Sequence, residues 1–184
     1  VKMRKEMVFN LVDPRDNPLV KPEYIETEAK PMTTIYEMAK TLPNMGIKSP
    51  AVWLPYGVLG VSTSEILADE TKGKFGPFAG QLFVGDQGMS KIARVFLEKV
   101  NGKYQGASFD FMSGFRSGVL RMTWGSDNSM FVGGTNRGWG SIGKEDFGLE
   151  RLVFSGKTPF EMKAVRAMPD GFEIEFTLPV NRKL

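Results

Sequence analysis

The stretch G-F-R-S-G-V-L-R, from Gly114 to Arg121, is followed by S-M-F-V-G-G, from Ser129 to Gly134. A similar pair occurs earlier in the chain, as G-I-K-S-P-A-V-W (Gly46–Trp53) and Q-L-F-V-G-D (Gln81–Asp86). Short apolar runs between glycine-rich turns are typical of β-strands, and a repeat of about 40–50 residues is typical of β-propeller blades. The sequence therefore predicts an all-β chain built from a repeated sheet.

The two halves of this repeat have different spacings. The front halves lie 68 residues apart, from Ser49 to Ser117, whereas the back halves lie 48 apart, from Phe83 to Phe131. The difference of 20 residues predicts one insertion in the first copy, within positions 54–80.

The predicted repeat divides the chain into three parts. Residues 1–45 predict an irregular connection with a short helix, and residues 46–157 predict propeller blades, as repeats 46–113 and 114–157. Residues 158–184 predict a last blade strand or the start of an Ig-like β-sandwich. Two to three blades are fewer than a closed propeller needs. We therefore expect a partial β-propeller that the remainder of a longer parent chain or other copies complete. The alternative is an unrelated compact β fold.

Local patterns predict individual elements. Ala51–Leu54 and Val58–Ser62 are predicted as strands, and Ser64–Ala68 as a single helical turn. The pair Asn101-Gly102 predicts a tight hairpin, and Met168–Gly171 predicts a second turn between two strands.

Composition excludes several classes of function. The chain contains neither Cys nor His, which excludes disulfides, thiolate metal sites and histidine base catalysis within these residues. The net charge is only +3 and the basic residues are scattered, so no nucleic-acid surface is expected. No apolar run approaches the length of a membrane-spanning helix, and no signal peptide is recognisable.

Most of the chain after residue 45 resembles a known family. The segments P-A-V-W-L-P-Y-G (50–57) and G-K-F-G-P-F-A-G-Q-L-F-V-G-D-Q (73–87) take part in the resemblance. So do the long block from F-R-S-G-V-L-R to R-G-W-G-S (115–141) and G-L-E-R-L-V-F-S-G-K-T-P-F-E-M (148–162). They are similar to the later blades of bacterial glucose/sorbosone dehydrogenase-like β-propellers that use pyrroloquinoline quinone (PQQ). The resemblance is to large secreted members that also carry a cytochrome c module.

The resemblance implies a periplasmic or extracellular protein with PQQ and calcium on one face of a six-bladed propeller. The implied reaction oxidises a sugar hydroxyl and passes electrons to a cytochrome, with haem confined to a separate module. In that family a histidine accepts the proton, and this chain has none, so no catalytic residue is assigned and enzyme activity is left open. The alternatives are a non-catalytic propeller module that binds carbohydrate or protein partners, and a purely structural module.

Candidate site residues follow the two F-V-G strands. Asp86 and Gln87 follow the first strand, and Asn136, Arg137 and Trp139 follow the second, so a propeller would present both sets on one face. Arginine suits the carboxylates of the quinone, and tryptophan offers its flat ring an aromatic face. The simpler interpretation is that these residues cap turns and pack loops. The predicted cofactor-binding set is Asp86, Gln87, Arg116, Asn136, Arg137 and Trp139. No metal ligand is assigned.

Overall fold

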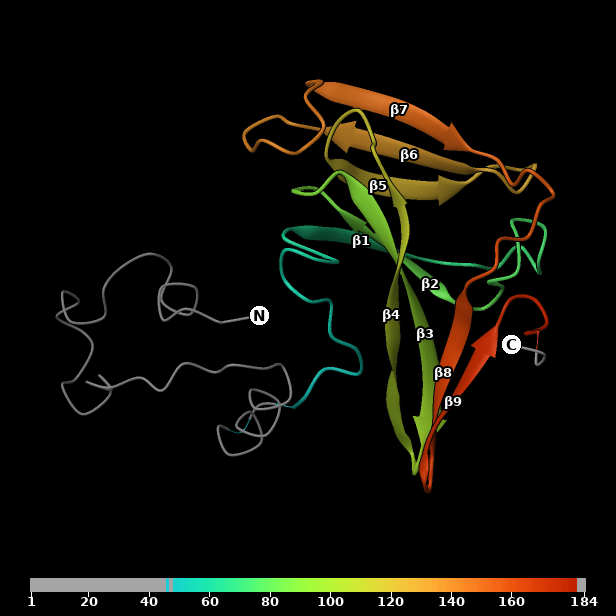
Figure 1. Cartoon of the computed structure of the whole chain (residues 1–184). Coiled ribbons are helices and arrows are strands. Elements are labelled where there is room, and N and C mark those ends of the chain that lie inside the picture. Colours follow the sequence, from blue (N-terminus) through green and yellow to red (C-terminus); the bar gives the residue numbers. More distant parts are fainter. Residues whose placement is uncertain (1–45, 47, 182–184) are drawn as a thin grey trace, which may run out of the picture. The chain divides into compact units, whose positions relative to one another are not determined.

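The computed structural model describes residue 46 and residues 48–181 (Figure 1). The chain divides into two units, Val1–Ser49 and Pro50–Leu184, and the fold described below is that of the second. The described residues form nine strands and no helix, and all strand pairs are antiparallel, which confirms the all-β class. Accordingly, the described part contains no helix capable of crossing a membrane. The predicted short helix and the rest of the 1–45 region lie outside the described residues.

The first sheet has its strands in sequence order. They are β1 (Thr63–Ala68), β2 (Leu82–Asp86), β3 (Lys91–Val100) and β4 (Lys103–Ser113). The predicted hairpin between β3 and β4 is confirmed, because Asn101-Gly102 forms its turn with positive φ values of 48° and 80°. Two consecutive positive φ values match the twist of the flanking strands, which explains why Asn-Gly is favoured here.

The second sheet follows the same order with β5 (Val119–Trp124), β6 (Met130–Thr135) and β7 (Phe147–Leu152). A two-stranded sheet of β8 (Met162–Met168) and β9 (Gly171–Phe176) completes the described part and confirms the predicted hairpin there. Figure 1 shows β5–β7 as a separate layer at the top of the view, with β8–β9 alongside β3.

The three strands of the second sheet match the first three strands of the first sheet. Phe83 in β2 pairs with Arg94 in β3, and Phe131 in β6 pairs with Arg151 in β7. The predicted alignment of Phe83 with Phe131 therefore holds in three dimensions, since both occupy the same place in the second strand. It also makes β7 the counterpart of β3, a part of the repeat that the sequence analysis missed.

The first strands carry the same irregularity. The register shifts between Thr63 and Glu65 in β1, and between Val119 and Arg121 in β5. A β-bulge at the same place in two sheets indicates that β5 is the counterpart of β1. The predicted front half of the repeat, which aligned Ser49 with Ser117, is therefore wrong.

Three local predictions are wrong. Residues 51–54 and 58–62 form no strand, and residues 64–68 belong to β1 rather than to a helical turn. The segment S-E-I-L-A favours a helix locally, but pairing with β2 and a hydrogen bond from Ser64 Oγ to Val119 O (2.8 Å) hold it extended.

The insertion in the first copy is shorter than predicted. The β1–β2 connection comprises residues 69–81, whereas its counterpart in the second sheet comprises residues 125–129. The difference is eight residues rather than 20. The second sheet has an insertion of its own at the opposite end, because residues 87–90 connect β2 to β3 while residues 136–146 connect β6 to β7.

The hydrophobic core lies between the two larger sheets. Gly85 approaches the second sheet so closely that a Cβ atom there would lie 2.7 Å from Val119 Cγ1. The 69–81 connection adds two buried phenylalanines to this core. The buried core residues are Phe75, Phe78, Phe83, Ile92, Phe115, Val119, Met122, Met130 and Val132. Burial of this apolar surface is the main stabilising term for the pair of sheets.

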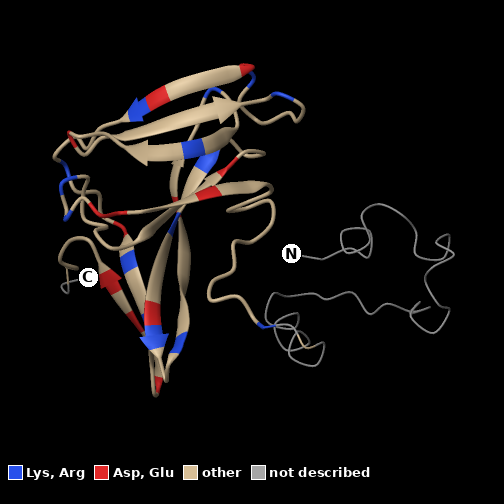
Figure 2. Ribbon diagram, turned by 180° about the vertical axis from the view of Figure 1, so that it is seen from behind, with Lys and Arg blue, Asp and Glu red and all other residues tan. Residues whose placement is uncertain are grey.

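The opposite face of the first sheet is covered by residues 50–62. Ser108 Oγ donates to Trp53 O (2.7 Å), and Lys91 Nζ donates to Val58 O (3.1 Å). Figure 2 shows that Lys and Arg residues and Asp and Glu residues are scattered along the strands and loops.

Candidate functional site

The loops that follow β2 and β6 meet at one end of the two sheets. Gln87 Nε2 donates to Thr135 O (3.1 Å) and to Trp139 O (2.8 Å), which joins the 87–90 turn to the 136–146 loop. The two predicted groups of site residues therefore lie side by side. Gln87 itself is buried, and its Oε1 atom has no hydrogen-bond partner in the described part of the chain.

Asp86 is fully buried, and its carboxylate holds two loops together. Its Oδ2 atom accepts hydrogen bonds from the backbone N–H groups of Val61 and Ser62, and its Oδ1 atom accepts one from Met89, all at 2.7 Å. Hydrogen bonds to an ionised acceptor are among the stronger ones in proteins. Asp86 therefore fixes the backbone around the site and does not face solvent.

Asn136 has a similar role within the long loop. Its Oδ1 atom accepts a hydrogen bond from Gly118 N (3.2 Å) and lies 2.6 Å from Ser141 Oγ, while its Nδ2 atom donates to Gly143 O (2.6 Å). Gly143 N in turn donates to Ser90 Oγ (2.9 Å) in the neighbouring turn. These bonds fix the loop backbone against both sheets.

The remaining predicted residues reach the surface. Arg116 forms an ion pair with Glu145 (2.8 Å), and the two side chains are 64% and 49% exposed. Arg137 is exposed, and Trp139 is 70% exposed. Arg137 and Trp139 are thus the two members of the predicted set that are presented to solvent without holding the loops together.

The described residues do not contain an acidic cluster that would hold calcium. Calcium takes six to eight oxygen ligands, and no group of three or more acidic side chains able to hold a metal occurs in the described part. The Asp86 oxygens already accept three backbone N–H groups, and the Asn136 amide is used within its loop. Arg137 and Trp139 are the members of the predicted set whose side chains have no such role, and a cofactor role for the set stays a prediction.

A buried arginine was missed by the sequence analysis. The Arg94 guanidinium lies between the rings of Phe78 (3.9 Å) and Phe109 (4.4 Å), and Glu161 lies 3.8 Å from its Nη2 atom. Burial lowers the pKa of Arg94 to about 10, with partial compensation from the Glu161 charge. The available signal was the pattern I-A-R-V-F, which places an arginine on the same side of the strand as buried Ile92.

Arg94 connects the first sheet to the β8–β9 hairpin. Its Nη1 atom donates to Gln81 Oε1 (2.6 Å) and Lys163 O (3.1 Å), and its Nη2 atom donates to Met162 O (2.7 Å). The guanidinium thereby satisfies two backbone carbonyl groups of β8. These contacts give Arg94 a structural role, while its Nε atom has no hydrogen-bond partner in the described part of the chain and the residue lines a cavity beside β4.

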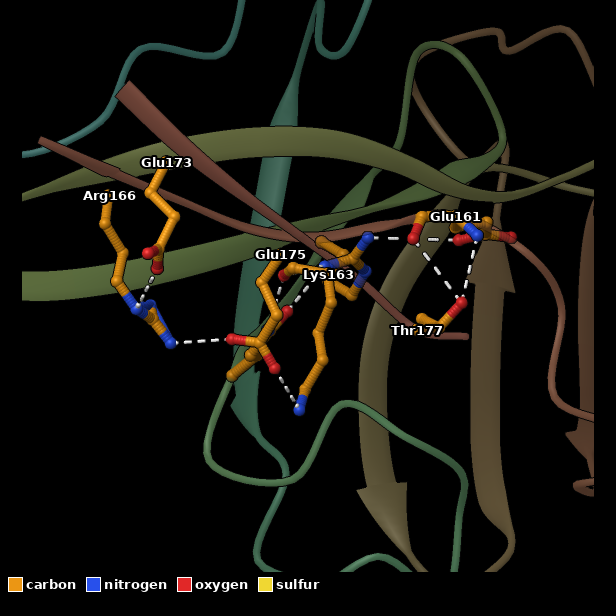
Figure 3. A network of polar contacts seen from close by, with 8 residues as sticks. Glu161, Lys163, Arg166, Glu173, Glu175 and Thr177 are labelled. Atoms are coloured by element: carbon orange, nitrogen blue, oxygen red, sulfur yellow. Dashed lines mark hydrogen bonds and ion pairs between the residues drawn. The ribbon is translucent and has the colours of Figure 1, made fainter. Parts of the chain in front are cut away.

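Cross-strand ion pairs support the same hairpin (Figure 3). Glu175 binds both Lys163 (2.8 Å) and Arg166 (2.7 Å), and Glu173 lies 3.9 Å from Arg166. The hydrogen bond from Lys163 lowers the pKa of the Glu175 carboxyl. Such half-exposed pairs contribute little individually, so the network orients the hairpin more than it stabilises the fold.

A cavity of about 570 Å³ lies beside β4 rather than at the loop end. Leu59, Phe109, Asp110 and Met162 are among its lining residues, and none of the six predicted site residues lines it. It therefore does not contribute to the predicted site.

Comparison with models of protein families, with curated proteins and with solved structures found no match to this chain.

Proposed function

We propose that the chain contributes two stacked sheets to a non-catalytic, β-propeller-like module that binds an anionic carbohydrate. A four-stranded antiparallel sheet in sequence order is the unit of a propeller blade, and β1–β4 has this order. The strand-for-strand match of β5–β7 and its face-to-face packing on β1–β4 support a repeated arrangement. We also propose that β8–β9 is the start of an Ig-like β-sandwich.

The observation that carries the binding proposal is an exposed tryptophan on a loop held by the side-chain amides of Gln87 and Asn136. Gln87 donates directly to Trp139 O, and Asn136 holds the loop three residues earlier. Binding residues are often found on loops that a rigid scaffold positions. The indole of Trp139 offers a sugar ring a flat apolar face, and Arg137 offers a carboxylate two parallel hydrogen bonds.

We expect the full chain to bind polygalacturonate more tightly than neutral dextran. Trp139→Ala should weaken polygalacturonate binding by about tenfold or more, because aromatic anchors dominate binding energy at such sites. Arg137→Gln should reduce the preference for the charged polymer. Isothermal titration and affinity electrophoresis measure both effects.

The matched control is Phe172→Ala, which removes an equally exposed aromatic side chain from β9. It should leave binding unchanged, and all three variants should melt at the wild-type temperature. Equal binding of the two polymers, or an unchanged affinity in Trp139→Ala, would overturn the proposal.

The second candidate function is that of a segment of a PQQ-dependent sugar dehydrogenase whose proton acceptor lies outside this chain. The exposed pair of Arg137 and Trp139 favours it, because the quinone needs a positive charge and an aromatic face. PQQ and calcium added to a preparation containing the chain should then restore dye reduction with aldoses, and Arg137→Gln should raise the PQQ concentration required. No quinone binding in equilibrium dialysis would exclude this candidate.

A further inference from the structure

The match between the two sheets shows that a face that is buried in the first sheet corresponds to a face that is exposed in the second. Ile92 lies opposite Gly85, and Leu149 lies opposite Gly133, so the two pairs are counterparts. Ile92 is fully buried, whereas Leu149 is 75% exposed. A Cβ atom on Gly85 would collide with Val119, whereas one on Gly133 would meet only atoms of Arg121 at 3.8 Å or more. The second sheet thus repeats a packing surface that the described residues leave uncovered.

The chemistry of this surface is also repeated. Arg94 donates to the side chain of Gln81, the residue before β2, and Arg151 Nε donates to Ser129 Oγ (2.9 Å), the residue before β6. Arg94 is covered by β8, whereas Arg151 is half exposed and binds Asp127. We call the surface formed by Phe131, Gly133, Phe147, Leu149 and Arg151 the outer face.

The other end of the stack shows the complementary feature. Ile66 pairs with Val84 and Met122 pairs with Val132, so Ile66 is the counterpart of Met122. Met122 is buried against the first sheet, whereas Ile66 is 65% exposed. The covering segment beside it adds further exposed apolar side chains, which are Tyr56, Val58 and Val61. We call this surface, with Ile66, the β1 end.

We infer that a second copy of this chain docks head to tail, with the outer face of one copy against the β1 end of the next. In this contact the outer face packs against Ile66 and the exposed apolar side chains of residues 50–62, which cover the rest of that face of the first sheet. It is heterologous, since two different surfaces meet, and such contacts generate rings when the rotation closes and open filaments when it does not. The contact rests on the repeated sheets and is independent of ligand binding by the 136–146 loop.

The test is sedimentation of the full chain from low to high micromolar concentration. Wild-type protein should form species larger than a dimer as the concentration rises. Leu149→Glu should block the outer face and Ile66→Glu the β1 end, so each variant alone should sediment as a monomer. A mixture of the two variants should form a dimer and nothing larger, because each supplies the surface that the other lacks.

Three results would overturn the inference. The first is a wild-type protein that stays monomeric at every concentration. The second is self-association of Ile66→Glu, which would indicate that two outer faces pack together. The third is association that persists in Leu149→Glu. Phe172→Glu is the matched control, with an exposed aromatic residue on the hairpin, and should associate like the wild type. If thermal melting shows that Leu149→Glu is unfolded, Phe147→Ser blocks the same face at a position that is also largely exposed.

Discussion

Replacing Arg94 with alanine is expected to lower the free energy of unfolding by about 3–5 kcal/mol, the range seen when one partner of a buried charged network is removed. The variant leaves Gln81 Oε1 and two carbonyl groups of β8 without their donor. It also empties the space between the rings of Phe78 and Phe109. The hairpin should therefore loosen together with the end of the first sheet.

Urea denaturation of the full chain measures this loss, and the repeat supplies the control. Arg151→Ala removes the counterpart arginine, which is half exposed and pairs with a carboxylate at the surface. Its effect should be much smaller, since exposed ion pairs contribute little. Arg94→Lys should fall between the two, because lysine keeps the charge but loses the planar stacking. Equal losses in Arg94→Ala and Arg151→Ala would contradict the structural role assigned to Arg94.

Asp86→Ala is expected to lower the free energy of unfolding by about 2–4 kcal/mol, because three backbone N–H groups lose a charged acceptor. These N–H groups belong to Val61, Ser62 and Met89, so two loops are released at once. Asp86→Asn should lose less, since the amide keeps one oxygen acceptor at nearly the same position.

Thermal and urea denaturation without any ligand measure the effect of Asp86→Ala. Asp127 provides the control, because its carboxylate serves the exposed turn before β6 and hydrogen bonds from Ser129 lower its pKa to about 2. Asp127→Ala should destabilise the chain less than Asp86→Ala. If Asp86→Ala melted like the wild type and lost only ligand binding, the carboxylate would be a ligand group, as the sequence analysis predicted.

Local sequence was sufficient to predict hairpins where the alternation of apolar residues and the turn residues agreed. Asn101-Gly102 and Met168–Gly171 were both correctly predicted as turns between two strands. β1 was missed because its residues favour a helix and become a strand only through pairing with β2 and contact with β5. The length of β4 was missed as well, because its extent is set by pairing along all of β3.

The candidate site was predictable in its location but not in the roles of its residues. Aligning Phe83 with Phe131 was enough to place Gln87 beside the 136–146 loop. A polar side chain is buried only where N–H groups from distant parts of the sequence can donate to it. For Asp86, these are the backbone N–H groups of residues 61 and 62. The β8 partners of Arg94 could not be predicted, because they lie on a hairpin that begins 68 residues later.

The two insertions of the repeat lie at opposite ends of the sheets and differ in what depends on them. The 69–81 connection supplies Phe75 and Phe78 to the core, so its sequence is constrained by folding. The 136–146 loop is held mainly by polar contacts to neighbouring turns and presents Arg137 and Trp139 to solvent. The specificity of the proposed binding site therefore depends on a loop that can be exchanged while the sheets beneath it keep a constant framework.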